Sequence, residues 1–99
     1  MSHYIALIIP TAVGEWRVLF PDVPGCETLG FTLEDARYAA VSALRQRVQS
    51  AGASAPTPHT LVAIAENEQW LSSNGIDLSK AIVEVVAVPD TWMSRELQS

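Results

Sequence analysis

The chain has 99 residues, of which 48% are hydrophobic and 17% are charged, a composition typical of one folded domain and unlike that of a disordered segment. Six basic and eleven acidic residues give a net charge of −5, which disfavours direct binding to nucleic acid and favours a basic protein partner. The single cysteine excludes an internal disulfide, and the longest candidate for a membrane segment, residues 4–10, is too short to span a bilayer. We therefore expect a cytoplasmic protein without membrane contact.

The N-terminal part of the sequence predicts a β-hairpin. Residues 3–9, HYIALII, are apolar on both alternating faces, which is typical of a central strand covered on both sides. Residues 15–20, EWRVLF, alternate in the period of two that indicates a half-covered strand. A third short strand is expected over residues 27–31.

The stretch FPDVPGCETLG, residues 20–30, lies between the second and third expected strands. Its two prolines restrict the backbone, its glycines permit positive φ, and its aspartate can accept hydrogen bonds from nearby amides. These constraints predict a structural turn that leads to a helix cap, formed by Phe20, Pro21, Asp22, Pro24, Gly25, Cys26, Gly30 and Thr32.

The sequence does not supply the additional residues that a catalytic or metal-binding role of this turn would need. A nucleophilic Cys26 would need a base, and the only histidines, His3 and His59, stand in no pattern with it. One cysteine and two scattered histidines do not make a zinc site. We expect no cofactor, no metal and no enzymatic activity; a residual hydrolase is the least supported alternative.

A helix is predicted from Leu33 to about Ser50. Thr32 is its N-cap, with acidic residues in the first turn, and Gly52 is its C-cap. The expected buried stripe has the helical spacing of three and four residues; it consists of Leu33, Ala36, Ala40, Leu44 and Val48.

The C-terminal half predicts a second helix and a last strand. A connector over residues 53–58 precedes a helix from His59 or Thr60 to about Leu71, with Leu61, Ile64, Ala65 and Leu71 on one side. Residues 81–88, AIVEVVAV, predict another central strand, which a right-handed crossover would place parallel to the first. The expected fold is α+β, in the order β-β-β-α-α-β, with a mixed sheet and helices packed on it. The domain would cover residues 1–89, followed by a short tail, residues 90–99.

The sequence resembles the HicB-like antitoxins of bacterial toxin-antitoxin systems. The resemblance rests on YIALI, on the run FPDVPGCETLGFTLEDA and on IVEVVAVP, and it extends over about residues 4–89. It implies a partial RNase H-like fold and a basic HicA-type toxin, an RNA-cleaving protein, as the partner. It also implies a homodimer or a higher oligomer.

The resemblance stops short of the C-terminal DNA-binding segment that many HicB antitoxins carry. We therefore expect no direct contact with nucleic acid. An alternative is a stand-alone HicB-like scaffold or small-ligand-binding protein that has neither a toxin nor a DNA partner.

Candidate contact residues are few. We expect Glu15, Trp16, Asp22, Glu27 and Glu84 to contact the protein partner, and Trp92 in the tail to contact another subunit. Two of these have simpler interpretations: Trp16 as a core residue of the hairpin, and Glu84 as a solvent-facing position near the end of the sheet.

Overall fold

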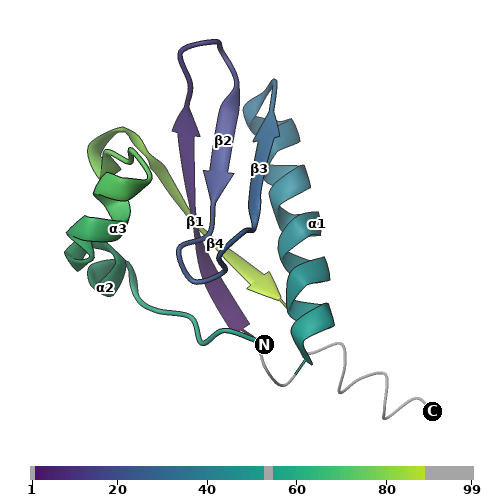
Figure 1. The fold of residues 1–99 in the computed structure, drawn as a ribbon. Helices are drawn as coiled ribbons and strands as arrows, with labels where there is room; N and C mark the ends of the chain where they lie inside the picture. Colours follow the sequence, from purple (N-terminus) through teal and green to yellow (C-terminus); the bar gives the residue numbers. More distant parts are fainter. Residues whose placement is uncertain (1, 53–54, 89–99) are drawn as a thin grey trace.

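The computed structural model describes residues 2–52 and 55–88. Three strands come first, followed by the long helix, two short helices, a short 3₁₀ helix and a fourth strand (Figure 1). In chain order these are β1 (Ser2–Pro10), β2 (Trp16–Leu19), β3 (Glu27–Gly30), α1 (Leu33–Ala51), α2 (Leu61–Glu66), α3 (Glu68–Ser73), η2 (Leu78–Lys80) and β4 (Ile82–Val88). The α+β class and the predicted order of strands and helices are confirmed.

The four strands form one sheet in the order β3-β2-β1-β4, and every neighbouring pair is antiparallel. The predicted mixed sheet, with its last strand parallel to the first, is wrong. After α1 the chain crosses to the other face of the sheet, passes through α2 and α3, and reaches η2 near the C-terminal end of β1 (Figure 1). The last strand therefore starts at that end, with Ile82 opposite Ile8, and runs back until Val88 lies opposite Ser2.

The position of β4 also differs from the prediction of a central strand, because β4 lies at the edge of the sheet. Its residues alternate between two environments. Val88 is buried on the α1 side, whereas Val83 and Val85 are exposed on the opposite face. A continuous apolar run therefore marks an edge strand here.

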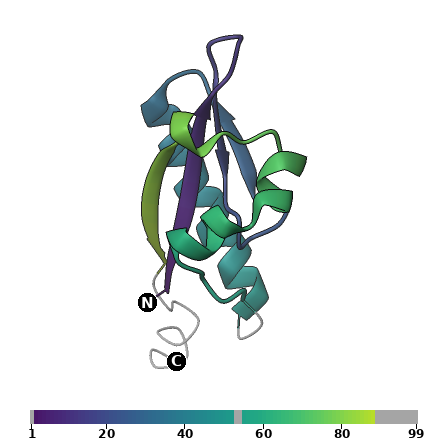
Figure 2. The same cartoon turned by 90° about the vertical axis from the view of Figure 1, so that its left-hand side faces the viewer.

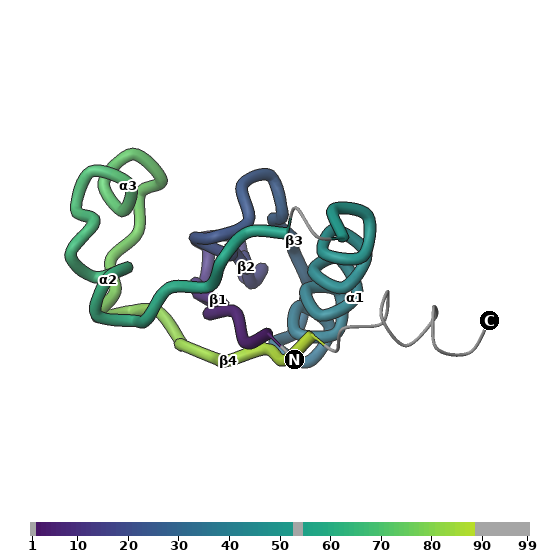
Figure 3. The backbone as a smooth tube through the Cα atoms, turned by 90° about the horizontal axis from the view of Figure 1, so that it is seen from below, coloured from purple at the N-terminus to yellow at the C-terminus, as the bar shows by residue number. Residues whose placement is uncertain are grey.

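Each face of the sheet has its own hydrophobic cluster, and β1 supplies alternate residues to both, as expected of a central strand. Tyr4, Ala6 and Ile8 pack with α1, while Ile5 and Leu7 pack with Ile64, Leu71 and Ile76 on the α2–α3 side. Figures 2 and 3 show α1 on one side of the sheet and the two short helices on the other. The predicted covering of β1 on both faces is confirmed.

Both ends of α1 are formed by the predicted residues. The Oγ1 atom of Thr32 accepts a hydrogen bond from the Asp35 amide at 3.0 Å, and the amide of Gly52 donates to the Val48 carbonyl. Of the predicted stripe, Leu33 is half-buried and the other four residues are buried.

The predicted second helix is interrupted at Asn67. Asn67 has non-helical backbone angles, φ −86° and ψ 69°, and its side chain caps α3 by accepting a hydrogen bond from the Trp70 amide at 3.2 Å. Ile64 and Leu71 are buried as expected, but Leu61 and Ala65 are exposed. The break turns α3 so that Leu71 can reach the sheet.

Candidate functional site

The stretch from Phe20 to Cys26 folds into two successive turns. The Val23 amide donates to the Phe20 carbonyl at 3.0 Å, and the Cys26 amide donates to the Val23 carbonyl at 3.1 Å. Phe20, Val23 and Cys26 point into the core that α1 covers, and Gly25 has a φ of 81°. This geometry holds Pro21 and Asp22 at the surface beside the α2–α3 segment.

Asp22 is bonded to His59, which lies 37 residues later in the chain. One carboxylate oxygen accepts the His59 backbone amide at 2.7 Å, and the other lies 2.6 Å from the His59 Nδ1 atom. The Asp22 side chain is only 10% exposed, against 61% for His59. The carboxylate therefore joins the turn after β2 to the residue that precedes the cap of α2.

The Asp22–His59 pair forms one side of a small surface depression with a volume of about 130 Å³. The other walls come from Pro21, Ala63, Ile64, Asn67 and Trp70. A carboxylate that accepts the Nδ1 proton leaves Nε2 as the free nitrogen of the imidazole. The depression thus presents one polar ring and one aromatic surface, which suits contact with a side chain of a partner protein.

Glu27 is held by a fork of hydrogen bonds from Arg17. Nε and Nη2 of Arg17 contact the two carboxylate oxygens at 3.1 and 3.0 Å, while Nη1 donates to the Asn74 carbonyl at 3.1 Å. Arg17 therefore ties the β2–β3 ladder to the end of α3. A bidentate arginine–carboxylate pair fixes the relative orientation of the two side chains, in addition to the attraction between their charges.

The remaining predicted contact residues lie in separate places. Glu84 forms an ion pair with Arg37 of α1, and Trp16 is half-buried against the α1-side cluster. Glu15 belongs to the turn at the far end of the hairpin, where its amide donates to the Thr11 Oγ1 atom at 3.1 Å. Trp92 lies outside the described residues.

The structure therefore does not gather the five predicted contact residues into one surface. Glu15 and Trp16 lie at the start of β2, whereas Asp22 and Glu27 flank the turn beyond its other end. Glu84 faces α1 through the ion pair with Arg37. In addition, Asp22, Glu27 and Glu84 each have a partner within the chain, so a protein partner would have to compete with those contacts.

A second set of acids, which the sequence did not single out, lies on the α2–α3 side. Glu66, Glu68 and Asp77 are exposed, and residues 61–77 contain no lysine or arginine. Hydrogen bonds from the Ser79 side chain and backbone, with a smaller contribution from Lys80, lower the pKa of Asp77 and keep it charged. The pattern in the sequence was three acids within residues 61–77, which contain no lysine or arginine, a weak signal in a chain that is acidic throughout.

Cys26 shows no sign of activation. The thiol is buried among core residues, and burial raises its pKa, an effect that the positive charge of Arg47 only partly opposes. A reactive cysteine needs a lowered thiol pKa, which favours the thiolate.

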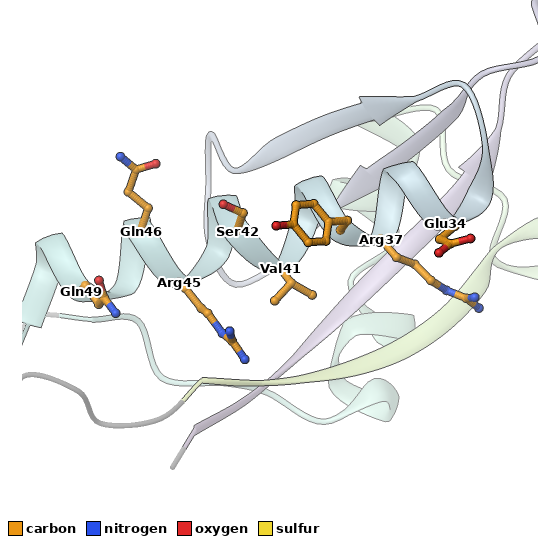
Figure 4. A pocket seen from close by; sticks show the side chains of 8 residues that line it. Glu34, Arg37, Val41, Ser42, Arg45, Gln46 and Gln49 are labelled. Atoms are coloured by element: carbon orange, nitrogen blue, oxygen red, sulfur yellow. The ribbon is translucent and has the colours of Figure 1, made fainter. Parts of the chain in front are cut away.

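The outer face of α1 carries a broad, shallow depression with a volume of about 640 Å³ (Figure 4). Glutamate, arginine, glutamine and serine side chains surround Tyr38 and Val41 there. Tyr38 is 82% exposed. This face differs in charge from the α2–α3 side, because α1 contributes Arg37 and Arg45 here together with the single acid Glu34.

Residues 2–52 and 55–88 contain no group of three or more histidine, cysteine, aspartate or glutamate side chains placed to hold a metal ion. In the same ranges, no helix has the length and apolar character needed to cross a membrane.

No protein-family model matches the sequence, and no curated protein matches it either. Solved structures do match. The N-terminal domain of the Burkholderia pseudomallei antitoxin HicB superposes with a TM-score of 0.67 at 18% identity, over 88% of this chain and 98% of that one. The longer HicB structure from the same organism matches with a TM-score of 0.70 at 18% identity, over 90% of this chain and 63% of that one.

A chain from a HicA3–HicB3 toxin-antitoxin complex matches as well, with a TM-score of 0.58 at 22% identity, over 88% of this chain and 98% of that one. The three matches cover 88–90% of this chain, whose described part contains the three-stranded meander, the long helix and the returning edge strand. The protein thus has the fold of the N-terminal domain of the HicB antitoxin.

Proposed function

We propose that this protein is an antitoxin module that binds a basic, RNA-cleaving toxin of the HicA type and blocks its active surface. The observation that carries the proposal is the match to a chain of the HicA3–HicB3 complex, which covers 88% of this chain. The proposal assigns binding rather than catalysis to the domain, residues 1–89, and places it in the cytoplasm with its target.

The charge distribution supports a basic partner on the α2–α3 side. Glu66 and Glu68 are exposed there, within residues 61–77, which contain no lysine or arginine, and the net charge of the chain is −5. A positive partner surface would be attracted to this side at long range, and less so to α1, where arginines offset the acidic residues. The depression beside His59 and Trp70 gives the same side a place for an inserted side chain.

Growth rescue tests the proposal. The neighbouring genes are first read for a small basic HicA-type protein, whose absence would favour the stand-alone scaffold. That protein is then expressed alone and together with the full chain; we expect growth arrest in the first case and growth in the second. The two proteins should also elute together from a sizing column. Arrest that persists in the presence of the chain, with separate elution, would reject the toxin-binding role and leave the stand-alone scaffold.

A matched pair of variants tests the surface. Glu66→Gln with Glu68→Gln, and Gln46→Lys with Ser50→Lys, each raise the net charge by two, on opposite sides of the sheet at exposed positions. We expect the first pair to weaken toxin binding about tenfold or more through lost charge attraction. The second pair should change binding much less; equal effects would mean that only the net charge matters.

A further inference from the structure

The small depression beside α3, here named the His59 depression, has walls that the fold holds in place. Its lining includes Asp22, His59, Asn67 and Trp70, and its volume is about 130 Å³. His59 is bonded to the Asp22 carboxylate through its backbone amide and its Nδ1 atom, at 2.7 and 2.6 Å. The Trp70 amide donates to the Asn67 side chain at 3.2 Å, and the Trp70 carbonyl accepts the Asn74 side chain at 2.8 Å. A ligand that enters here therefore meets ordered groups, which lowers the entropy cost of binding.

Trp70 gives this depression an aromatic wall. The residue is half-buried against the hydrophobic cluster of the α2–α3 side. It also borders a second depression, about 180 Å³ in volume, which has Glu27 and Asn74 in its lining and is here named the Glu27 depression. Each depression thus combines the same indole with one carboxylate, Asp22 in the first and Glu27 in the second.

The two carboxylates differ in how their charge is offset. Two hydrogen bonds from Arg17 hold Glu27, and a guanidinium keeps its positive charge throughout the ordinary pH range. Asp22 is held by a histidine, which offsets its charge only when the imidazole is protonated. Of the described residues that line the His59 depression, none is a lysine or an arginine. The exposed Glu66 and Glu68 lie at the junction of α2 and α3, part of the same wall. The His59 depression is therefore the negative one of the two.

We propose that the His59 depression binds the guanidinium group of an arginine that the basic partner inserts, an inference that rests on the proposed toxin-binding function. The planar group would stack on the Trp70 indole, which favours a cation on its face. It would donate a hydrogen bond to His59 Nε2, which is an acceptor as long as Nδ1 donates its proton to Asp22. The carboxylate behind the ring polarises the imidazole and strengthens that acceptor. Neither bond between Asp22 and His59 has to break.

Other side chains complement these walls less well. A carboxylate would be repelled by Asp22, Glu66 and Glu68. A lysine ammonium carries the same charge as arginine, but it is more strongly hydrated and cannot lie flat on an indole. An apolar side chain would remove water from His59 Nε2 and give it no donor in return. Charge and shape together thus favour arginine.

The first test uses the full chain alone. The ¹⁵N-labelled protein is titrated with N-acetyl-arginine amide, and NMR follows the His59 amide and the Trp70 indole signal, which is identified by its absence in Trp70→Leu. We expect both signals to shift and saturate with a dissociation constant in the millimolar range, about 4 kcal/mol of binding. The lysine analogue should bind at least about threefold more weakly, and the citrulline analogue, which has nearly the same shape without the charge, should not saturate. The absence of saturation with arginine, or equal binding of citrulline, would overturn the proposal.

Three variants locate the binding site. His59→Ala keeps the backbone hydrogen bond to Asp22 and removes the acceptor, so arginine should bind about tenfold more weakly. Asp22→Asn can donate to Nδ1, which moves the ring proton to Nε2 and turns the acceptor into a donor; the same loss is expected. The matched control is Glu27→Gln, which changes the other depression beside Trp70 and should leave the dissociation constant within about twofold. Unchanged binding in His59→Ala, or an equal loss in Glu27→Gln, would contradict the assignment.

The second test measures the affinity of the same variants for the HicA-type toxin. His59→Ala should raise the dissociation constant about tenfold and Glu27→Gln much less. Toxin binding that is unchanged in His59→Ala would overturn this inference and leave the antitoxin role intact. Binding of N-acetyl-arginine amide by a chain that does not bind the toxin would instead reject the antitoxin role and, with it, the toxin as the source of the arginine.

Discussion

The Asp22 carboxylate holds both the backbone amide and the imidazole of His59, at 2.7 and 2.6 Å. These two residues belong to segments that are far apart in the sequence, and the contact attaches the start of the α2–α3 segment to the turn after β2. Among the contacts of acidic side chains with arginine or histidine in the described residues, it is the one in which a side chain is nearly buried.

Removing this carboxylate should loosen the α2–α3 segment. Asp22→Ala leaves the His59 amide without its acceptor, so we expect the free energy of unfolding to fall by about 2 kcal/mol in urea titrations. His59→Ala keeps the backbone hydrogen bond and loses only an exposed ring contact, so the free energy of unfolding should fall by only about 0.5 kcal/mol. Equal losses in the two variants would show that the ring, not the amide, makes the important contact.

Gly30→Ala should be strongly destabilising. The added Cβ would meet the backbone of Ala36 at 2.4 Å, and α1 can avoid it only by moving away from β3. We expect a loss of about 3 kcal/mol, measured by thermal unfolding. Gly14→Ala is the comparison: no atom lies within 4 Å of the added Cβ, and only the positive φ of 86° is unfavourable. Its cost should be about 1 kcal/mol.

The Arg17 fork should contribute modestly to stability. Arg17→Lys keeps the charge but loses the two-point contact with Glu27 and the bond to the Asn74 carbonyl. Because Glu27 is 45% exposed, we expect a loss of about 1 kcal/mol. A double-mutant cycle with Glu27→Gln measures the pair itself, and a coupling energy near zero would show that the Asn74 contact accounts for the loss.

Burial of Cys26 should make stability depend on pH in the alkaline range. Burial raises the pKa of the folded thiol above its ordinary value of 9.0, so the unfolded chain loses this proton first. The contribution is complete below pH 9 and declines as the pH rises toward the folded pKa. Cys26→Ala should therefore show a shallower fall in melting temperature above pH 9 than the natural chain. Parallel curves would contradict this account.

Structural features that depend only on residues close together in the sequence were predicted well. Thr32 and Gly52 marked the ends of α1 because capping depends on amides three or four positions away. The apolar run at the start of the chain predicted a central strand for the same local reason. The break at Asn67 was missed because an asparagine inside an apolar pattern is compatible with both a helix and a cap.

Structural features that depend on residues far apart in the sequence were not predicted. The direction of β4 follows from the path of the chain through α2 and α3. The residues of β4 itself do not indicate that path. The run AIVEVVAV satisfied the pattern of a covered strand, yet Val83 and Val85 have no cover among the described residues. The bond between Asp22 and His59 depends on the whole fold, so Asp22 was assigned to a partner on the basis of its charge alone.

The pairing of Ser2 with Val88 also determines the order in which the protein can fold during synthesis. β1 is the first strand to leave the ribosome, and one of its two edges stays open until β4 follows more than seventy residues later. The hairpin, β3 and α1 can assemble early from neighbouring segments, but the central strand is completed last. Until then the nascent chain exposes a long, apolar and unpaired edge, which makes this stage of folding the one most prone to aggregation.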